Sequence, residues 1–329
     1  MSAEIIVDTD IDTDCDDAGA LAVLHNLAQA GEANIAGIVC SIPYAPTADC
    51  VRAINAYYGR PEIPVGLLGE ESLEASPRFA VYREHLASAE AQGWRRYNEV
   101  VATELADLVE GTAPPADAVS LYRRLLSERP DNSVVIVAIG LLTALEKLLD
   151  SRPDDHSSLS GAELIERKVR KLVTMGLGSF PSGKDVFNWK MDRQAAAAVF
   201  ERWPGTIAVS EWGSTVHTGA SLSTRCRVRN PVRRAYEVYL GGAGRNRSSW
   251  DQVAMLYAVR GAGDLFEEIS GNRLRYEPSS GRHEWRQSPS PESQHIYLKQ
   301  TVSDELLARV IEELMIREPR GVCRTTLRN

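Results

Sequence analysis

Residues 5–24 read IIVDTDIDTDCDDAGALAVL. The apolar run 5–7 comes first, and the small and apolar residues 18–24 follow with the pattern of a helix. Between them lie six aspartates: Asp8, Asp10, Asp12, Asp14, Asp16 and Asp17. The stretch therefore predicts a buried strand, an acidic turn and a helix in immediate succession. Ligands of open α/β sheets bind at the carboxyl ends of the strands, which is where this turn would stand.

The rest of the chain repeats this alternation of short apolar runs with helical patterns. Further strands are expected near residues 35–40, 133–139, 171–175 and 206–209, and helices near residues 17–30, 47–58, 142–149 and 192–202. The expected strands are continuously apolar, which is typical of parallel strands that are covered on both faces. The alternation predicts right-handed βαβ units and hence an α/β fold, with a mostly parallel, Rossmann-like open sheet and helices on both faces.

One domain is predicted over residues 1–329. This length permits one large domain or two smaller ones, but no linker or internal repeat marks a boundary. Residues 71–130 are mostly helical and polar in pattern. Residues 270–297 are rich in Ser, Pro, Gly and Arg, and we expect them to form a loop or hairpin excursion.

The composition argues against several classes of protein. The formal net charge is -8 and no basic block stands out, which argues against a nucleic-acid surface. No apolar stretch approaches the roughly 20 residues of a membrane span, and no basic and then apolar leader is visible. The five cysteines are scattered, without a CxxC pair, so a disulfide framework or a zinc site is not expected. We expect a cytoplasmic protein without nucleic-acid or membrane partners.

The acidic turn needs an explanation, because six carboxylates within ten residues repel one another unless a cation neutralises them. A helix dipole favours Asp16 and Asp17 as capping charges, but that accounts for only two of the six. Hard oxygen ligands prefer Ca²⁺ or Mg²⁺ to zinc or copper, so we favour a metal site over a solvated loop. The EF-hand spacing fails when counted from Asp8 or Asp10, and the DxDx[TV] pattern of haloacid-dehalogenase phosphatases fails in every frame.

A third pattern fits. Residues 8–18, DTDIDTDCDDA, resemble the amino-terminal signature of the nucleoside hydrolases (the inosine-uridine-preferring ribohydrolase family), DTDxGxDDA or its longer form DTDIGxDxDDA. Three more segments resemble family motifs in the same order: VVIVAIGLLTALEKLL (134–149), VTMGLGSFPSGKDVFN (173–188) and WDQVAMLYAV (250–259). The chain is thus similar to a divergent member of this family.

The resemblance implies a reaction and roles for single residues. The reaction is hydrolysis of the N-glycosidic bond of a nucleoside-like substrate, which releases base and sugar. The expected ligands of a Ca²⁺ ion are Asp10, Asp17, Asp251 and, through its backbone carbonyl, Ile139. Asp10 is also the expected general base, while Asp16 and Asn188 match residues that bind the sugar hydroxyls. Family members are usually dimers or tetramers, so a homo-oligomer is expected.

Four departures from the family pattern alter the sugar and base pockets. Asp12 replaces the glycine of the turn, which adds charge and, we expect, backbone strain. Val186 stands where the family has a glutamate, and residues 42–44 (IPY) replace a glycine-asparagine pair. Trp250 replaces the histidine that helps the base to leave. Two alternatives therefore stay open: the same pocket acting on another glycoside or ribosyl metabolite, and a non-catalytic protein that binds nucleosides or sugars.

The activation of the leaving group is unassigned, because Trp250 cannot donate a proton at neutral pH. His217 could act as the acid, since imidazole titrates near neutrality; the alternative is a structural histidine. A base could also be activated by stacking on Trp250 or Trp212, although packing roles compete with that interpretation.

Two more charged residues are candidates for substrate contacts. Lys184 either reaches the pocket, pairing with Asp185, or is simply solvated. Asp14 lies in the two-residue extension of the signature, and its role is open. An acidic pocket repels a phosphorylated substrate unless basic residues intervene, so an unphosphorylated substrate is expected.

Overall fold

The apolar run that opens the acidic stretch lies at the centre of a large sheet. β1 (Ala3–Thr9) pairs in parallel with β2 (Ala33–Cys40) on one side and with β5 (Val134–Ala138) on the other. Residues 5–7 are fully buried, because helices cover both faces of the sheet. The computed structural model describes residues 2–69, 72–176, 179–288 and 295–319.

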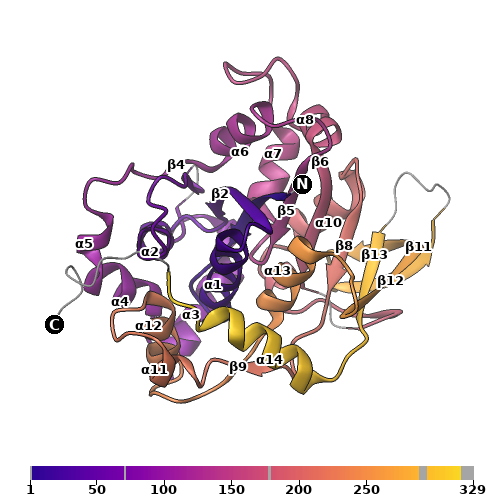
Figure 1. Ribbon diagram of the computed structural model, residues 1–329. Coiled ribbons are helices and arrows are strands. Elements are labelled where there is room, and N and C mark those ends of the chain that lie inside the picture. The colour runs from indigo at the N-terminus through magenta and orange to yellow at the C-terminus, as the bar shows by residue number, and fades with distance from the viewer. Residues whose placement is uncertain (1, 70–71, 177–178, 289–294, 320–329) are drawn as a thin grey trace.

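Eleven of the described strands form one sheet with the order β4-β3-β2-β1-β5-β6-β8-β13-β11-β12-β7 (Figure 1). All pairs from β4 to β13 are parallel, and the further bounds are β3 (Val65–Leu67), β4 (Ala116–Asp117), β6 (Val169–Met175), β8 (Ile207–Ser210) and β13 (His295–Gln300). The remaining pairs are antiparallel and involve β11 (Phe266–Glu277), β12 (Arg282–Gln287) and β7 (Ser182–Lys184). The single α/β domain with a mostly parallel sheet is confirmed, whereas the antiparallel margin was expected only as a loop or hairpin over residues 270–297 and not as part of this sheet.

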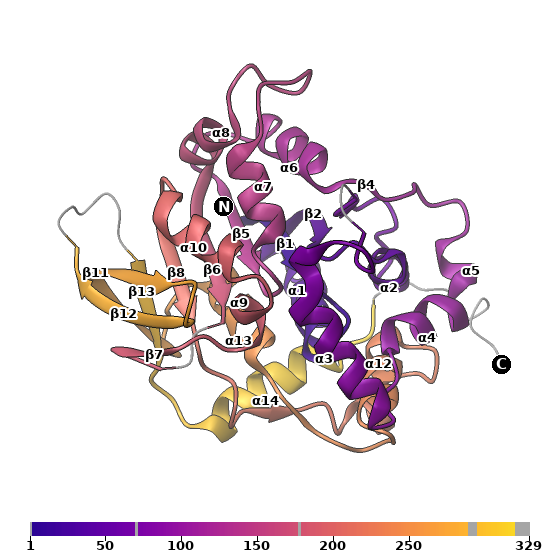
Figure 2. The ribbon, with the colours of Figure 1, turned by 180° about the vertical axis from the view of Figure 1, so that it is seen from behind.

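Two layers of helices enclose the sheet, each with its own apolar core. Ile5 and Val7 face the first core and Ile6 the second, as the two-residue period of a strand requires. The first core is covered by α1 (Asp16–Gln29), α2 (Ala45–Tyr57), α12 (Pro231–Tyr239), α13 (Trp250–Arg260) and α14 (Asp304–Met315). Figure 2 shows the other layer, formed by α3 (Ala80–Ala91), α6 (Ala118–Ser127), α7 (Thr143–Asp150), α8 (Gly161–Lys168) and α10 (Arg193–Arg202).

The four helices expected from the pattern begin and end within two residues of α1, α2, α7 and α10. The shorter elements are α4 (Tyr97–Glu104), α5 (Ala106–Val109), α9 (Phe187–Met191), α11 (Leu222–Arg225), the 3₁₀ turn Pro77–Phe79, and a separate ladder of β9 (His217–Thr218) and β10 (Arg247–Ser248). Among the described residues, no helix has both the length and the apolar character that crossing a membrane requires.

The segment 270–297 contains a hairpin. The second half of β11 pairs antiparallel with β12, from Asn272 opposite Gln287 to Glu277 opposite Arg282. Residues 289–294 of this segment lie outside the described residues, as does Cys323. The hairpin adds to the sheet rather than projecting from it, because β13 joins β11 to the parallel strands.

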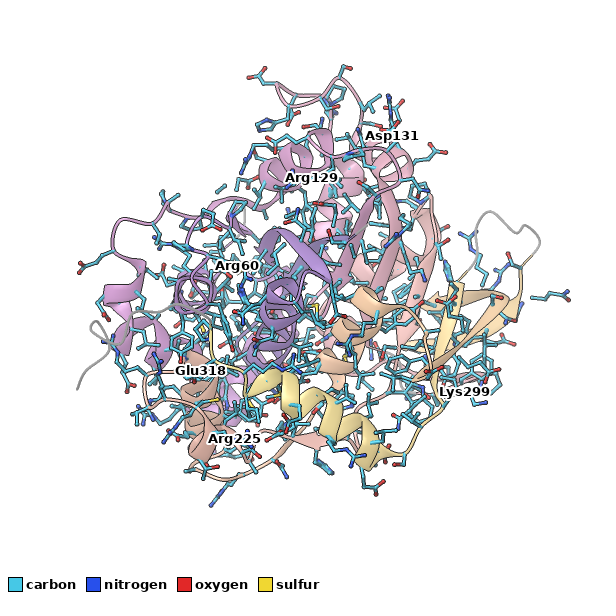
Figure 3. All side chains as sticks on the ribbon, viewed as in Figure 1. Arg60, Arg129, Asp131, Arg225, Lys299 and Glu318 are labelled. Carbon is cyan, nitrogen blue, oxygen red and sulfur yellow. The ribbon has the colours of Figure 1, made fainter. Side chains whose placement is uncertain are left out.

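The surface carries charges of both signs. Figure 3 labels several peripheral side chains, among them Arg225 and Lys299. Lys299 pairs with Glu267 at 3.0 Å, and both side chains are about half exposed. Ion pairs this exposed contribute little to stability, so the two apolar cores hold the fold together.

The packing of α1 against α13 depends on a glycine. A Cβ atom at Gly19 would collide with the side-chain amide of Gln252 and the hydroxyl of Tyr236. Those two groups are already joined, because Gln252 Nε2 donates to Tyr236 Oη at 2.7 Å. Gly19 therefore lets the amino-terminal halves of the two helices approach each other.

Gly19→Ala is expected to lower the free energy of unfolding by about 1–3 kcal/mol, the usual cost of overpacking. Helix propensity alone would give a gain of about 1 kcal/mol, so the two effects have opposite signs. Chemical denaturation measures the result, and Ala28→Gly near the end of the same helix calibrates the propensity effect. A stability gain in Gly19→Ala would contradict the close packing.

Candidate active site

Several chain segments meet at the carboxyl edge of the parallel strands. The acidic turn follows β1, Ser41 follows β2 and Ile139 follows β5. The helices α1 and α13 pack against each other and both begin at this edge. Their first turns carry Asp16 and Asp17 in α1 and Asp251 in α13. Two helix amino termini, each with a positive dipole end, thus supply the acidic residues.

Three carboxylates converge at this point. Asp16, Asp17 and Asp251 each offer an oxygen, and these oxygens lie within 4.8 Å of one another. All three side chains are buried, and the backbone N–H of Asp251 donates to Asp16 Oδ2 at 3.3 Å. Burial raises the pKa of each group well above its ordinary value, and the neighbouring negative charges raise it further. The set of hard oxygen donors fits a divalent cation such as Ca²⁺.

Asp10 lies beside this group and is not a member of the three. Burial raises the pKa of Asp10 well above its ordinary value, and the charges of Asp12 and Asp16 add to the effect. Its Oδ2 atom is buried and has no hydrogen-bond partner among the described residues. A buried carboxylate oxygen without a partner is costly, so this atom marks a place for a cation, a water molecule or a substrate hydroxyl. Asp16, which the family resemblance assigns to the sugar, thus stands in one group with Asp17 and Asp251.

The turn between β1 and α1 is fixed by Asp17. Thr9 Oγ1 donates to Asp17 Oδ1, and the backbone N–H of Ile11 donates to the same oxygen at 3.3 Å. Ile11 has a φ of 22°, an uncommon value for a β-branched residue. The strain that we expected at Asp12 therefore falls on Ile11, and the expectation for Asp12 is wrong. The physical reason is that these hydrogen bonds fix the backbone one residue earlier.

The carboxylate of Asp12 is held by side chains of α3 and α4. Tyr82 Oη donates to Asp12 Oδ2 at 3.0 Å, and Asn98 Nδ2 donates to Asp12 Oδ1 at 3.1 Å. The guanidinium of Arg96 is 3.7 Å from Asp12 Oδ2 and lies over the ring of Tyr44. Burial raises the pKa of Asp12 to about 6, although these partners oppose the shift. The added aspartate thus ties α3 and α4 to the acidic turn, a role that the sequence did not reveal.

Asp8 lies behind the turn, within β1. Tyr122 Oη donates to Asp8 Oδ2 at 2.7 Å, while Asp8 Oδ1 has no hydrogen-bond partner in the described part of the chain. Burial raises the pKa of Asp8 to about 7. Asp8 is therefore a buried polar residue beneath the carboxylates, and it is not one of the three that converge.

The predicted sugar residue and the predicted carbonyl ligand are in direct contact. Asn188 Nδ2 donates to the carbonyl oxygen of Ile139 at 2.7 Å. A carbonyl oxygen has two lone pairs, so one remains for another partner. Gly140 allows the end of β5 to approach the turn, because a Cβ there would collide with the backbone of Thr9 and Asp10. Val186, which stands where the family has a glutamate, packs against the apolar core.

The segments that carry His217 and Trp212 lie against the residues that lead into α13, because β9 pairs with β10 and a Cβ at Gly213 would meet the backbone of Trp250. His217 is exposed and, on the β9–β10 ladder, stands opposite Ser248, so it faces away from the side chain of Arg247. Trp212 is half-buried, and its indole N–H donates to the carbonyl of Leu298 at 2.7 Å. Lys184 is exposed on the marginal strand β7. Its expected partner Asp185 instead accepts hydrogen bonds from Arg193 at 2.8 Å and from the hydroxyl of Tyr276 at 2.7 Å.

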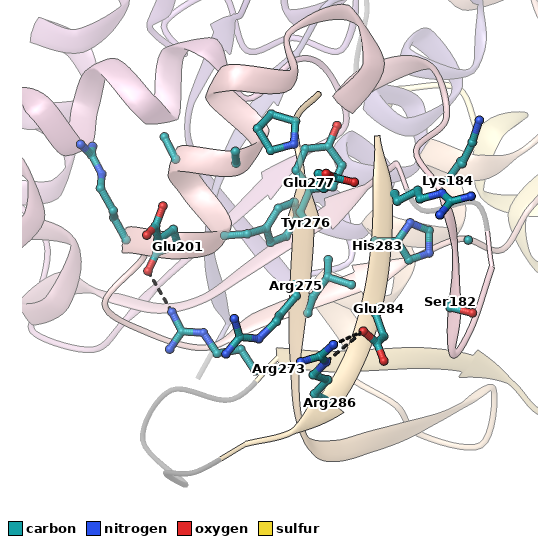
Figure 4. A pocket seen from close by; sticks show the side chains of 18 of the residues that line it. Ser182, Lys184, Glu201, Arg273, Arg275, Tyr276, Glu277, His283, Glu284 and Arg286 are labelled. Carbon is teal, nitrogen blue, oxygen red and sulfur yellow. Dashed lines mark hydrogen bonds and ion pairs between the residues drawn. The ribbon is translucent and has the colours of Figure 1, made fainter. Parts of the chain in front are cut away.

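A cavity of about 1560 Å³ lies between α10 and the antiparallel margin (Figure 4). Its labelled side chains include Arg273, Glu284 and Arg286, and the last two form an ion pair of 2.7 Å. Lys184 lines this cavity, and none of the aspartates of the acidic turn does. Lys184 thus belongs to a surface separate from the converging carboxylates.

Two residues at the acidic turn were missed by the sequence analysis. Arg247 Nε lies 3.0 Å from both carboxylate oxygens of Asp14, and Nη2 lies 2.5 Å from Oδ2. Arg247 also lies over the ring of Trp250, 5.0 Å from its centroid. Arg247 and Arg96 are thus basic residues that pair with aspartates of the acidic turn. The sequence held a signal, because Arg247 stands four residues before Asp251, but only the fold shows which carboxylate it meets.

Comparison with known proteins decides the family. The sequence profile of the inosine-uridine preferring nucleoside hydrolases matches residues 5–288. The chain belongs to this family. Membership makes the protein a hydrolase of N-glycosyl compounds. Its sequence identity to two solved nucleoside hydrolases is at most 18%, so it is a divergent member. No curated protein matches the chain significantly.

Solved structures share the fold of this nucleoside hydrolase family member. A plant nucleoside hydrolase, PpNRh1, has a TM-score of 0.64 at 18% identity, over 96% of this chain and 99% of that one. The inosine-uridine preferring nucleoside hydrolase of Bacillus anthracis has a TM-score of 0.64 at 17% identity, with the same coverage. The type III effector XopQ, solved with adenosine diphosphate ribose, has a TM-score of 0.64 at 15% identity over 96% of this chain and 94% of that one.

Calcium is expected to stabilise the protein more strongly as the pH rises. Without metal, the folded protein keeps protons on Asp10, Asp16, Asp17 and Asp251 to higher pH than the unfolded chain does. The free energy of unfolding of the chelated protein therefore falls as the pH rises above about 4, the ordinary aspartate value. Saturating calcium at about 100 times its Kd should restore about 3 kcal/mol near neutral pH.

Thermal unfolding with calcium or with chelator, at a series of pH values, measures this difference. Asp251→Asn should abolish most of the calcium effect, while Asp155→Asn, at an exposed loop position, should leave it intact. A calcium effect that is independent of pH would mean that the ion does not replace protons on these carboxylates.

Proposed function

We propose that this protein is a calcium-dependent nucleoside hydrolase that cleaves the N-glycosidic bond of a nucleoside-like substrate. The observation that carries the proposal is the convergence of Asp16, Asp17 and Asp251 beside an unpartnered oxygen of Asp10. Asp16, Asp17 and Asp251 come from two helices far apart in the sequence and meet at the edge where α/β sheets bind ligands. Family membership adds the class of reaction.

The residues that would hold the cation are Asp10, Asp17, Asp251 and the carbonyl of Ile139, with Asp16 close enough to contribute. When bound, calcium would lower the pKa of a water molecule and orient it toward the sugar. The side chains of the protein would neutralise the charge of the cation, position the sugar and accept a proton. The unpartnered Oδ2 of Asp10 is the acceptor proposed for the proton that the water loses.

The sugar would be held between the carboxylates and Asn188. Asp16 and Asn188 are proposed to bind its hydroxyl groups, and Asn188 is already fixed by its hydrogen bond to Ile139. Cleavage leaves positive charge on the sugar ring, and the surrounding buried aspartates stabilise that charge. An acidic pocket is therefore matched to the transition state rather than to the neutral substrate.

The range of substrates is tested by sugar release from a panel. The panel contains uridine, cytidine, inosine and adenosine, with ADP-ribose added because XopQ was solved with that molecule. Each compound is assayed with calcium and with chelator. Release from a nucleoside that stops with chelator supports the proposal; release from ADP-ribose alone would favour a ribosyl metabolite, and binding without release a non-catalytic protein.

Asp10→Asn should lower kcat by at least about 10²-fold, the lower end for loss of a general base. The fold should remain stable, because the change removes one of several buried like charges. Sugar release and thermal unfolding are measured on the same preparation, and Asp49→Asn, which loses a half-exposed carboxylate on α2, serves as the control. Near-wild-type turnover in Asp10→Asn would remove Asp10 from the mechanism.

A further inference from the structure

The ion pair between Asp14 and Arg247 lies close to the carboxylate group, because the charges of both residues act on Asp16. Asp14 lies in the two-residue extension of the acidic turn, and Arg247 begins β10, the short strand that leads into α13. The guanidinium of Arg247 lies 5.0 Å from the ring centroid of Trp250 and 5.6 Å from that of Tyr239. Tyr239 in turn meets the edge of Tyr97 at 6.4 Å. The cation is therefore clamped by one carboxylate and two aromatic rings.

Part of the guanidinium remains available. The contacts to Asp14 use Nε and Nη2 of Arg247, and Nη1 has no hydrogen-bond partner among the described residues. The side chain of Arg247 is 32% exposed, so its free N–H groups can reach a ligand. Burial lowers the pKa of Arg247, but the hydrogen bonds and charge of Asp14 raise it above its ordinary value. The group is thus a permanent cation and cannot act as a general acid.

Arg247 contacts the residue that stands at the position of the leaving-group acid of the family. Trp250, over which it lies, directly precedes Asp251 and stands where the family resemblance places the histidine that helps the base to leave. The charge of Arg247 also reaches Asp16, whose pKa it lowers against the larger effect of burial. His217, the other candidate, faces the opposite side of the β9–β10 ladder. Arg247 is therefore a described cation in direct contact with the residue that stands at the position of the family's histidine.

We propose that Arg247 is a specificity-determining residue that selects leaving groups departing as anions, and that Asp14 positions it. This inference rests on the proposed hydrolysis of N-glycosides. The bond between the anomeric carbon and the leaving atom breaks, and its electron pair stays on the leaving group. The water oxygen forms the new bond to the anomeric carbon, and the water proton goes to Asp10. Arg247 stabilises the developing anion by charge and hydrogen bonds and transfers no proton.

The test uses aryl β-D-ribofuranosides, in which the sugar is constant and the acidity of the leaving phenol varies. The slope of log(kcat/KM) against the pKa of the phenol measures how much charge on the leaving group goes unstabilised. In Arg247→Gln this slope should become steeper. The rate on phenyl riboside should fall about 10²-fold, as for loss of one preorganised donor, and the rate on 4-nitrophenyl riboside much less.

Matched variants separate the effect of the Arg247 charge and its positioning by Asp14 from a general structural effect. Arg247→Lys keeps the charge and should restore part of the slope, while Asp14→Asn, which loosens the clamp, should give an intermediate slope. Arg245→Gln removes the same charge two residues away, at an exposed position whose guanidinium donates to the carbonyl of Leu240, and should leave the slope unchanged. A slope that steepens in His217→Ala and not in Arg247→Gln would overturn the proposal in favour of a histidine acid.

A binding measurement keeps the inference separate from the proposed function. Titration with 4-nitrophenolate and with neutral 4-nitroanisole should show tighter binding of the anion to the wild type, and equal binding of both to Arg247→Gln. If the wild type binds the anion this way but releases no sugar, the hydrolase proposal fails and the anion site stands. If the wild type releases sugar and its slope coincides with that of Arg247→Gln, the hydrolase stands and this inference fails.

Discussion

The burial of several aspartates in one place is the constraint on which the structure depends. Desolvation and mutual repulsion both penalise the ionised forms of Asp10, Asp16, Asp17 and Asp251. A fold tolerates such an arrangement only if something compensates it. The dipoles of α1 and α13 compensate part, because both helices begin at the cluster. A bound divalent cation would compensate the rest.

The elements around the cluster are arranged to support this burial. Gly19 lets α1 and α13 approach, and Gly140 lets the end of β5 approach the turn. The outer aspartates are neutralised individually, Asp12 by the groups of α3 and α4 and Asp14 by Arg247. Charge at the edge of the site is thus balanced by the protein, whereas charge at its centre is left for a ligand.

Much of this could be predicted from the sequence, and the limits have physical reasons. Continuous apolar runs fixed the parallel strands, and the order of motifs indicated the family. A hairpin was expected within residues 270–297, but its joining to the main sheet through β13 was missed, because β13 pairs with β8, which lies far away in sequence. The partners of Asp12 and Asp14 were missed because Asn98 and Arg247 are far away in sequence, and only tertiary packing brings them together. A sequence pattern shows where the charged residues are, but it does not show which residues neutralise them.

The most direct test of the central claim is anomalous diffraction from crystals grown with calcium. We expect one ion about 2.3–2.6 Å from carboxylate oxygens of Asp17 and Asp251, with Asp10 or Asp16 completing the acidic ligands. The pKa values that are raised without metal would then be lowered, because each ligand must bind deprotonated. Crystals saturated with calcium that show no ion between these carboxylates, or an ion bound elsewhere, would contradict the account.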